Sequence, residues 1–155
     1  MNQFVILVIL SCLGSVWQKE GCKCSLPSPE AKTSWGQENV IIKLDEPFKF
    51  LHGKITISSD GKPLAGVLVE VYDKPEGLLL GWKEREARKS EQRKIAACVT
   101  SNDGEFCFDK IPSGKYELRC SKPAEWNSTS VYVIVDPKQR NSLASQIVVP
   151  MHISQ

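Results

Sequence analysis

Apolar and polar residues alternate along most of the chain after residue 50, in short runs separated by glycine, proline and asparagine. The clearest run follows the turn signal Asn102–Gly104, where Phe106 and Phe108 alternate with polar residues. This two-residue period is typical of a strand with one buried face. A second turn signal, Ile111–Gly114, follows, and the alternation resumes at Tyr116. The pattern predicts two consecutive strands joined by a tight turn.

The same reasoning predicts seven short strands and no sustained helix. We expect an all-β, seven-stranded Greek-key sandwich, because short strands at this spacing with turn residues between them favour two packed sheets. The apolar run Val40–Leu44 is open to two interpretations, since it could pair with the edge of the domain or only lead into it. The seven expected strands cover residues 54–58, 67–72, 95–100, 105–110, 116–121, 130–135 and 145–151.

The alternation also predicts which residues form the core, each contributing about 1.5–3 kcal/mol on burial. Gly104 and Gly114 are expected to adopt positive φ, where alanine would be strained. The residues expected to shape the turns are Gly61, Asp103, Gly104, Pro112 and Gly114. The expected inward set is Ile55, Ile57, Val67, Val69, Val71, Ala97, Val99, Phe106, Phe108, Tyr116 and Leu118, with residues of the last two strands.

The segment Leu78–Lys94 breaks the strand pattern, because an apolar start is followed by a strongly charged stretch. Its good helix formers and oppositely charged near neighbours favour a surface excursion of one or two helical turns, or a loop. We expect it to contact a partner; the simpler interpretation is a solvated loop whose apolar residues cap one end of the sandwich. The candidate contact residues are Leu79, Trp82, Lys83, Arg85, Arg88 and Lys89.

Length and composition are those of an ordinary globular domain with a tail. The 155 residues are 41% hydrophobic and 25% charged, which allows a core without metal or many disulfides. The net charge of +2 gives no global attraction to nucleic acid or to an anionic membrane.

The N-terminus predicts export. The apolar run Phe4–Leu10 has the length of a signal-peptide core and is too short to span a bilayer. We expect a signal peptide at residues 1–15, a polar tail at 16–49 and the sandwich at 50–155, in a secreted or periplasmic protein. A lipoprotein anchored through Cys12 is the alternative, since Ile9–Cys12 loosely resembles a lipobox.

Five of the six cysteines follow the expected signal peptide. Cys98 and Cys107 flank a predicted turn, so a cross-strand disulfide between them is one interpretation and two reduced, packed thiols the other. Cys120 shares the face of Leu118, which favours a buried thiol. For Cys22 and Cys24 in the tail, the alternatives are a soft-metal site, a bond to another chain, a bond to Cys120 and no role.

Four motifs in order resemble carboxypeptidase regulatory-like domains, which are transthyretin-like, or prealbumin-like, sandwiches. They are Gly53–Thr56, Gly61–Val71, Thr100–Phe108 and Ile111–Leu118, and the resemblance covers about Phe50 to Met151. It implies an accessory module of exported proteins and, without a peptidase domain, no peptidase activity. The chain departs from the pattern in its long charged excursion and its extra cysteines.

No catalytic motif accompanies this pattern. His52 and His152 are isolated, so neither a metal site nor a histidine-based hydrolase is supported. Lys54 stands where self-crosslinking adhesin modules carry a lysine, but the last strand offers no Asn or Asp partner. We expect a non-catalytic module without cofactor or metal, which binds a protein, glycan or envelope partner through its loops and does not bind nucleic acid. The alternatives are a lipid-anchored spacer, or a small metal-binding protein or hydrolase.

Overall fold

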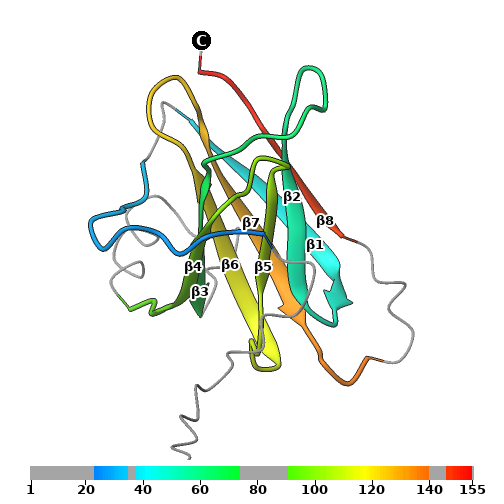
Figure 1. The fold of residues 1–155 in the computed structure, drawn as a ribbon. Coiled ribbons are helices and arrows are strands. Elements are labelled where there is room, and N and C mark those ends of the chain that lie inside the picture. The colour runs from blue at the N-terminus through cyan, green and yellow to red at the C-terminus, as the bar shows by residue number, and fades with distance from the viewer. Residues whose placement is uncertain (1–22, 35–37, 74–90, 140–145, 155) are drawn as a thin grey trace, which may run out of the picture.

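The computed structural model describes residues 23–34, 38–73, 91–139 and 146–154. In these ranges the chain forms eight strands and no helix (Figure 1). Among the described residues there is accordingly no helix with the length and apolar character needed to cross a membrane. The strands are β1 (Asn39–Phe48), β2 (Leu51–Ile57), β3 (Leu68–Asp73), β4 (Lys94–Val99), β5 (Glu105–Phe108), β6 (Gly114–Ser121), β7 (Ser128–Val135) and β8 (Ile147–Met151).

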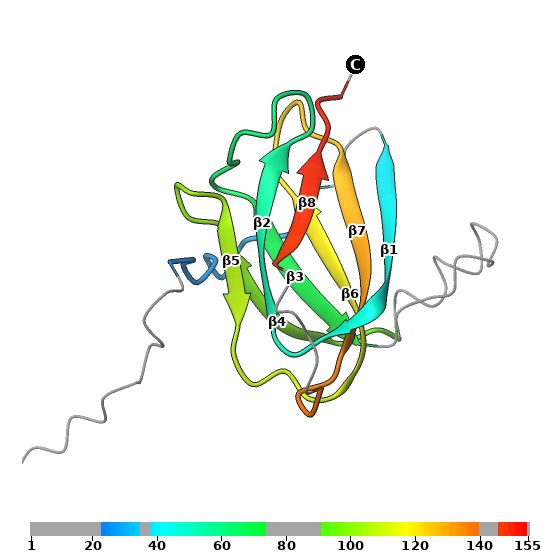
Figure 2. The same ribbon diagram turned by 90° about the vertical axis from the view of Figure 1, so that its right-hand side faces the viewer.

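The strands form two sheets that pack face to face, so the predicted all-β sandwich is confirmed (Figure 2). The larger sheet has the order β1-β7-β6-β3-β4 and the smaller has the order β5-β2-β8. Strands β1 and β8 run parallel to their neighbours β7 and β2, whereas the remaining pairs are antiparallel. Seven of the strands lie where the alternation places them, and β1 is the eighth.

Strand β1 adds an edge to the larger sheet upstream of the expected domain start. It pairs with β7 from Asn39 opposite Ser128 to Phe48 opposite Val135, with an irregularity between Lys43 and Pro47. Of the two interpretations of the apolar run at 40–44, the structure therefore shows pairing with the edge of the domain. The larger sheet therefore includes residues from Asn39 onward, within the segment expected as the tail.

The core lies between the sheets and contains most of the expected inward set. Phe106 and Leu118 come from different sheets and are almost completely buried. The rings of Phe106 and Phe108 lie 6.2 Å apart between centroids. The core residues include Leu51, Ile55, Val67, Val69, Val71, Tyr116, Trp126, Val131, Val133, Val135, Ile147, Val149 and Met151.

Strand β4 has the opposite facing from the one predicted. Cys98 pairs with Val69 and is 4% exposed, so it faces the core, whereas Val99 and Ala97 take the other phase. A shift of one residue exchanges the two faces of a strand. Because Cys98 and Val99 are both small and apolar, the residue types alone do not decide which of them faces the core. The placement of Ala97 and Val99 in the core is therefore wrong.

The turn glycines divide into two kinds. Gly61 and Gly104 have φ near +70° and +72°, as expected for Gly104. Gly114, in contrast, does not have positive φ, so that expectation is wrong, and Lys110 takes the left-handed conformation in this loop at φ 60°. Gly114 opens β6, where an added Cβ would lie 3.4 Å from the ring and hydroxyl of Tyr116.

The tail, residues 23–34, lies along the side where the edge strands β4 and β5 meet, as the blue segment in Figure 1 shows. Ser25 exchanges two backbone hydrogen bonds with Val99, at 3.0 and 2.8 Å. Cys24 packs against the core beside this bridge. Farther along, the Thr33 hydroxyl donates to the Glu70 carboxylate. The tail thus runs from the side between the two edge strands onto the outer face of the larger sheet.

Candidate functional site

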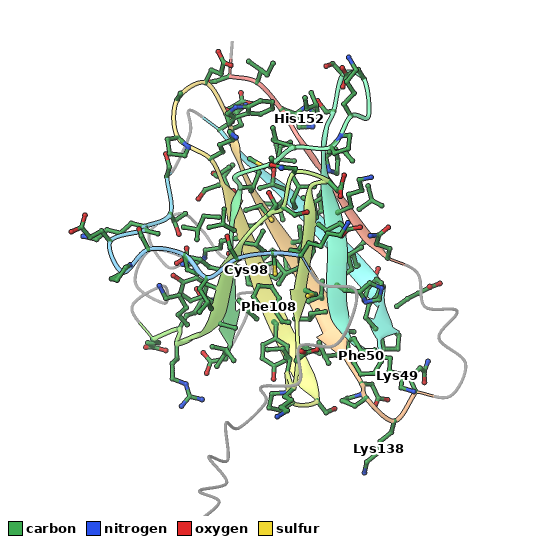
Figure 3. All side chains as sticks on the ribbon, viewed as in Figure 1. Lys49, Phe50, Cys98, Phe108, Lys138 and His152 are labelled. Atoms are coloured by element: carbon green, nitrogen blue, oxygen red, sulfur yellow. The ribbon has the colours of Figure 1, made fainter. Side chains whose placement is uncertain are left out.

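One end of the sandwich carries a hollow of about 330 Å³ formed by three connections. The β1–β2 turn supplies Lys49 and Phe50, the β5–β6 loop supplies Asp109 to Ile111, and Pro137 follows β7. Figure 3 shows Lys49, Phe50 and Lys138 at this end, with His152 at the opposite one. We call this feature the loop-end hollow; its lining residues are Lys49, Phe50, Leu51, Phe108, Asp109, Lys110, Ile111 and Pro137.

Local hydrogen bonds hold the walls of the loop-end hollow in place. The Tyr116 hydroxyl donates to the Pro112 carbonyl at 2.8 Å, which ties the β5–β6 loop to β6. The Asp136 amide donates to the Phe48 carbonyl at 2.9 Å, which joins the loop after β7 to the end of β1. Because the connections are fixed to strands, the hollow is a preformed feature of the scaffold.

The surface of the loop-end hollow combines an aromatic ring with positive charge. Phe50 is 44% exposed, and the Lys49 ammonium lies 5.6 Å from its ring centroid. Lys49 and Lys110 form no ion pair with any residue in the described ranges, and the lining contains one acid, Asp109. The site therefore offers apolar contact and positive charge together.

A second polar feature lies on the outer face of the larger sheet. The Arg119 guanidinium donates to Glu117 Oε1 at 3.1 Å and lies 3.9 Å from the Tyr72 ring. Gln92 donates to Glu117 Oε2 at 2.8 Å. Glu117 and Arg119 are both below one-tenth exposed. The members of this network are buried and bind one another, which fits a structural role better than a catalytic one.

Glu70 belongs to the same face and anchors two segments. Its side chain is 2% exposed, and one oxygen accepts from Lys94 at 3.1 Å. This contact with Glu70 is the main reason why the pKa of Lys94 is raised. The other oxygen accepts from Thr33, so one buried carboxylate holds both β4 and the tail. The buried charge of Glu70 therefore serves the attachment of the tail.

The cross-strand disulfide, one of the two interpretations of Cys98 and Cys107, is not formed, because Cys98 carries a free thiol. Strands β4 and β5 are consecutive in sequence but belong to different sheets, which removes the hairpin on which that prediction depended. Cys120 is a free, fully buried thiol, as expected, and burial raises its pKa to about 12. Cys24 Sγ lies 4.0 Å from Cys107 Sγ.

The remaining candidate residues are not brought together. All six candidate contact residues of the excursion, Leu79, Trp82, Lys83, Arg85, Arg88 and Lys89, lie outside the described residues, as do the expected signal peptide and Cys12. His152 contacts Ser58 at 3.0 Å and is remote from His52 in the fold. In the described ranges no three His, Cys, Asp or Glu side chains are grouped to hold a metal ion.

The loop-end hollow was not predicted from the sequence. Phe50 continues the apolar phase of Phe48 across a turn, so it could be taken for a core residue. Lys110 differs little in sequence from other loop lysines. The sequence signal for this site was an aromatic residue, Phe50, next to Lys49 between two strands. Only the fold brings the three connections together at one end of the sandwich.

One comparison with known proteins identifies a family. The SpaA family model, described as a prealbumin-like fold domain, matches residues 53–145. No curated protein and no solved structure matches the chain. The matched region covers more than half of the chain and runs from β2 to the connection before β8. With the two-sheet architecture described above, this match shows that the chain belongs to the SpaA prealbumin-like fold domain family.

Proposed function

We propose that this domain is an exported, non-catalytic binding module that engages a macromolecular partner through the loop-end hollow. The observation that carries the proposal is the conjunction of exposed Phe50 with two lysines that have no ion-pair partner in the described ranges. Exposed aromatic residues beside a concave surface are typical of binding sites.

The other polar constellations support a binding role over catalysis. The buried charged groups already have partners: Glu70 accepts from Lys94, and Glu117 accepts from Arg119. They therefore do not line an open site where a substrate could react. Within the family we further propose the carboxypeptidase regulatory-like type, because the order of the glycine turns resembles those domains.

The experiment places a photoreactive, benzophenone-bearing amino acid at position 50 of the full chain in the native host. Position 148 is the control, because Val148 is also an exposed apolar residue, 57% exposed, but lies on β8 in the smaller sheet. We expect a discrete crosslinked product from position 50 and none of that size from position 148. Identical products, or none at either position, would overturn the proposal.

Export is tested in the same cells by the intact mass of the extracytoplasmic protein. Loss of about fifteen residues, as signal cleavage requires, supports a secreted or periplasmic module. A mass that includes a lipid on Cys12 supports the anchored spacer instead, and an unprocessed cytoplasmic chain would contradict export.

A further inference from the structure

We propose that the loop-end hollow binds an apolar side chain together with a neighbouring carboxylate, the chemistry that the C-terminal residue of a partner polypeptide presents. The inference rests on the proposed function for the existence of a partner, and it adds the class of partner and the chemical group that is recognised. Two properties of the described residues carry it: the size and apolar character of the lining, and the sign of the charge around it.

The lining suits one large apolar side chain. Leu51, Phe108 and Ile111 form the floor as they enter the core, and each is at least nine-tenths buried. Phe50 adds an exposed ring at the rim. A volume of about 330 Å³ lies at the lower end for ligand sites, so the hollow accepts a side chain and not a folded surface.

The charge around the hollow favours an anion, because its lining carries two lysines and one acid, Asp109. Lys49 and Lys110 both border the hollow, and neither has an ion-pair partner in the described part of the chain. A charge–charge contact gains strength beside an apolar surface, because the local dielectric constant is lower than in water. A carboxylate placed next to an apolar group would lie at the lysine-bearing rim while the group covers the floor.

A sugar fits this lining less well than a peptide end. Sugars present many hydroxyl groups, and the lining offers one side chain that can accept their hydrogen bonds, Asp109, among mainly apolar neighbours. A polar ligand that leaves its hydroxyl groups facing an apolar floor loses their hydration without replacement. The observations therefore favour a polypeptide over a glycan.

The test uses two small probes that differ in one group, a charged carboxylate or a neutral amide. N-acetylphenylalanine carries an aromatic side chain beside a free carboxylate, and N-acetylphenylalaninamide carries the same side chain without the charge. Amide resonances of the full isotope-labelled chain are followed during titration. We expect the acid to shift residues 49–51 and 108–111 with a dissociation constant of about 1 mM, as suits a ligand of this size, and the amide to bind at least threefold more weakly.

Matched variants locate the interaction. Lys49→Met and Lys110→Met should each weaken binding of the acid about threefold and leave the amide unaffected. Lys62→Met is the control, because Lys62 lies in the turn after β2, at the end away from Leu51, and pairs with Asp60. Phe50→Ala should weaken both probes, whereas Val148→Ala should weaken neither.

Three outcomes would overturn the inference: equal binding of acid and amide, shifts confined to residues away from the hollow, or binding of a uronic-acid oligosaccharide in place of the acid. These results are separable from failure of the proposed function. A crosslink at position 50 without binding of the acid leaves the module intact but rejects the carboxylate chemistry. Binding of the acid without any crosslinked partner rejects the module's proposed role instead.

Discussion

Replacement of Gly53 by alanine should destabilise the domain strongly, because two neighbours stand where the added methyl group would lie. Gly53 lies in the middle strand of the smaller sheet, opposite Phe106 on one side and Ile147 on the other. A Cβ at this position would stand 2.2 Å from the Ile147 carbonyl oxygen and 2.5 Å from the Phe106 Cζ atom. Glycine inside a strand often marks such a close approach.

The magnitude follows from what would have to move. Carbon atoms in good contact stand about 3.5–4.0 Å apart, so the Phe106 ring must retreat by about 1 Å from a site where it is 1% exposed. The second clash is with backbone, which cannot rotate away as a side chain can. Overpacking of a core costs about 1–3 kcal/mol, and occasionally more. With both neighbours displaced, we expect a loss of about 3 kcal/mol or more, a large fraction of the stability of a typical domain.

The assay is equilibrium unfolding in urea, monitored by tryptophan fluorescence. An m-value, the dependence of the free energy of unfolding on urea concentration, that matches the parent protein is the check on two-state behaviour. Gly61→Ala is the matched control, because Gly61 has φ +70° but nothing within 4 Å of an added Cβ. It should lose only about 1 kcal/mol, from backbone strain. Phe106→Leu in the Gly53→Ala background should recover part of the loss, since the ring edge is removed.

The reasoning would be refuted if Gly53→Ala and Gly61→Ala were equally stable, or if the cost of Gly53→Ala were unchanged in the Phe106→Leu background. Either result would mean that β2 relaxes away from Phe106 and Ile147 and that their close approach is not what requires glycine.

Three further predictions concern the polar contacts and the thiols. Lys94→Met should lower the free energy of unfolding by about 1–2 kcal/mol, because Glu70 is left buried without its cation while Lys94 itself is half-exposed. The measurement is urea unfolding, with Lys43→Met as the control because it breaks an exposed ion pair. Equal losses in the two variants would contradict the prediction. Tyr116→Phe should cost about 1 kcal/mol through loss of the hydrogen bond to Pro112, and thermal unfolding that matches the parent would argue against that bond. The free energy of unfolding should fall as the pH rises above about 9, because burial raises the pKa of Cys120 from 9.0 to about 12 and the unfolded chain therefore releases the thiol proton first. Cys120→Ala should make the free energy of unfolding depend less steeply on pH between pH 9 and 10. An unchanged pH dependence would refute the role of Cys120.

The alternation of apolar and polar residues was sufficient to predict the strands and the class of fold. In β5 and β6 the large side chains of Phe106, Phe108 and Leu118 leave one inward phase, and the structure buries all three. Gly104 was recognisable for the same reason, since a tight turn needs a residue that tolerates positive φ, and it has φ +72°.

The sequence by itself therefore determined the positions of seven strands and the positive φ of Gly104, because each depends on residues a few positions apart. Only the tertiary structure decided which strands share a sheet, and it placed the consecutive strands β4 and β5 in different sheets. It also decided that β1 pairs with β7 and that Lys49, Lys110 and Pro137 meet at one hollow. Such contacts join residues tens of positions apart, and the two-residue period that marks a strand carries no information about its neighbour.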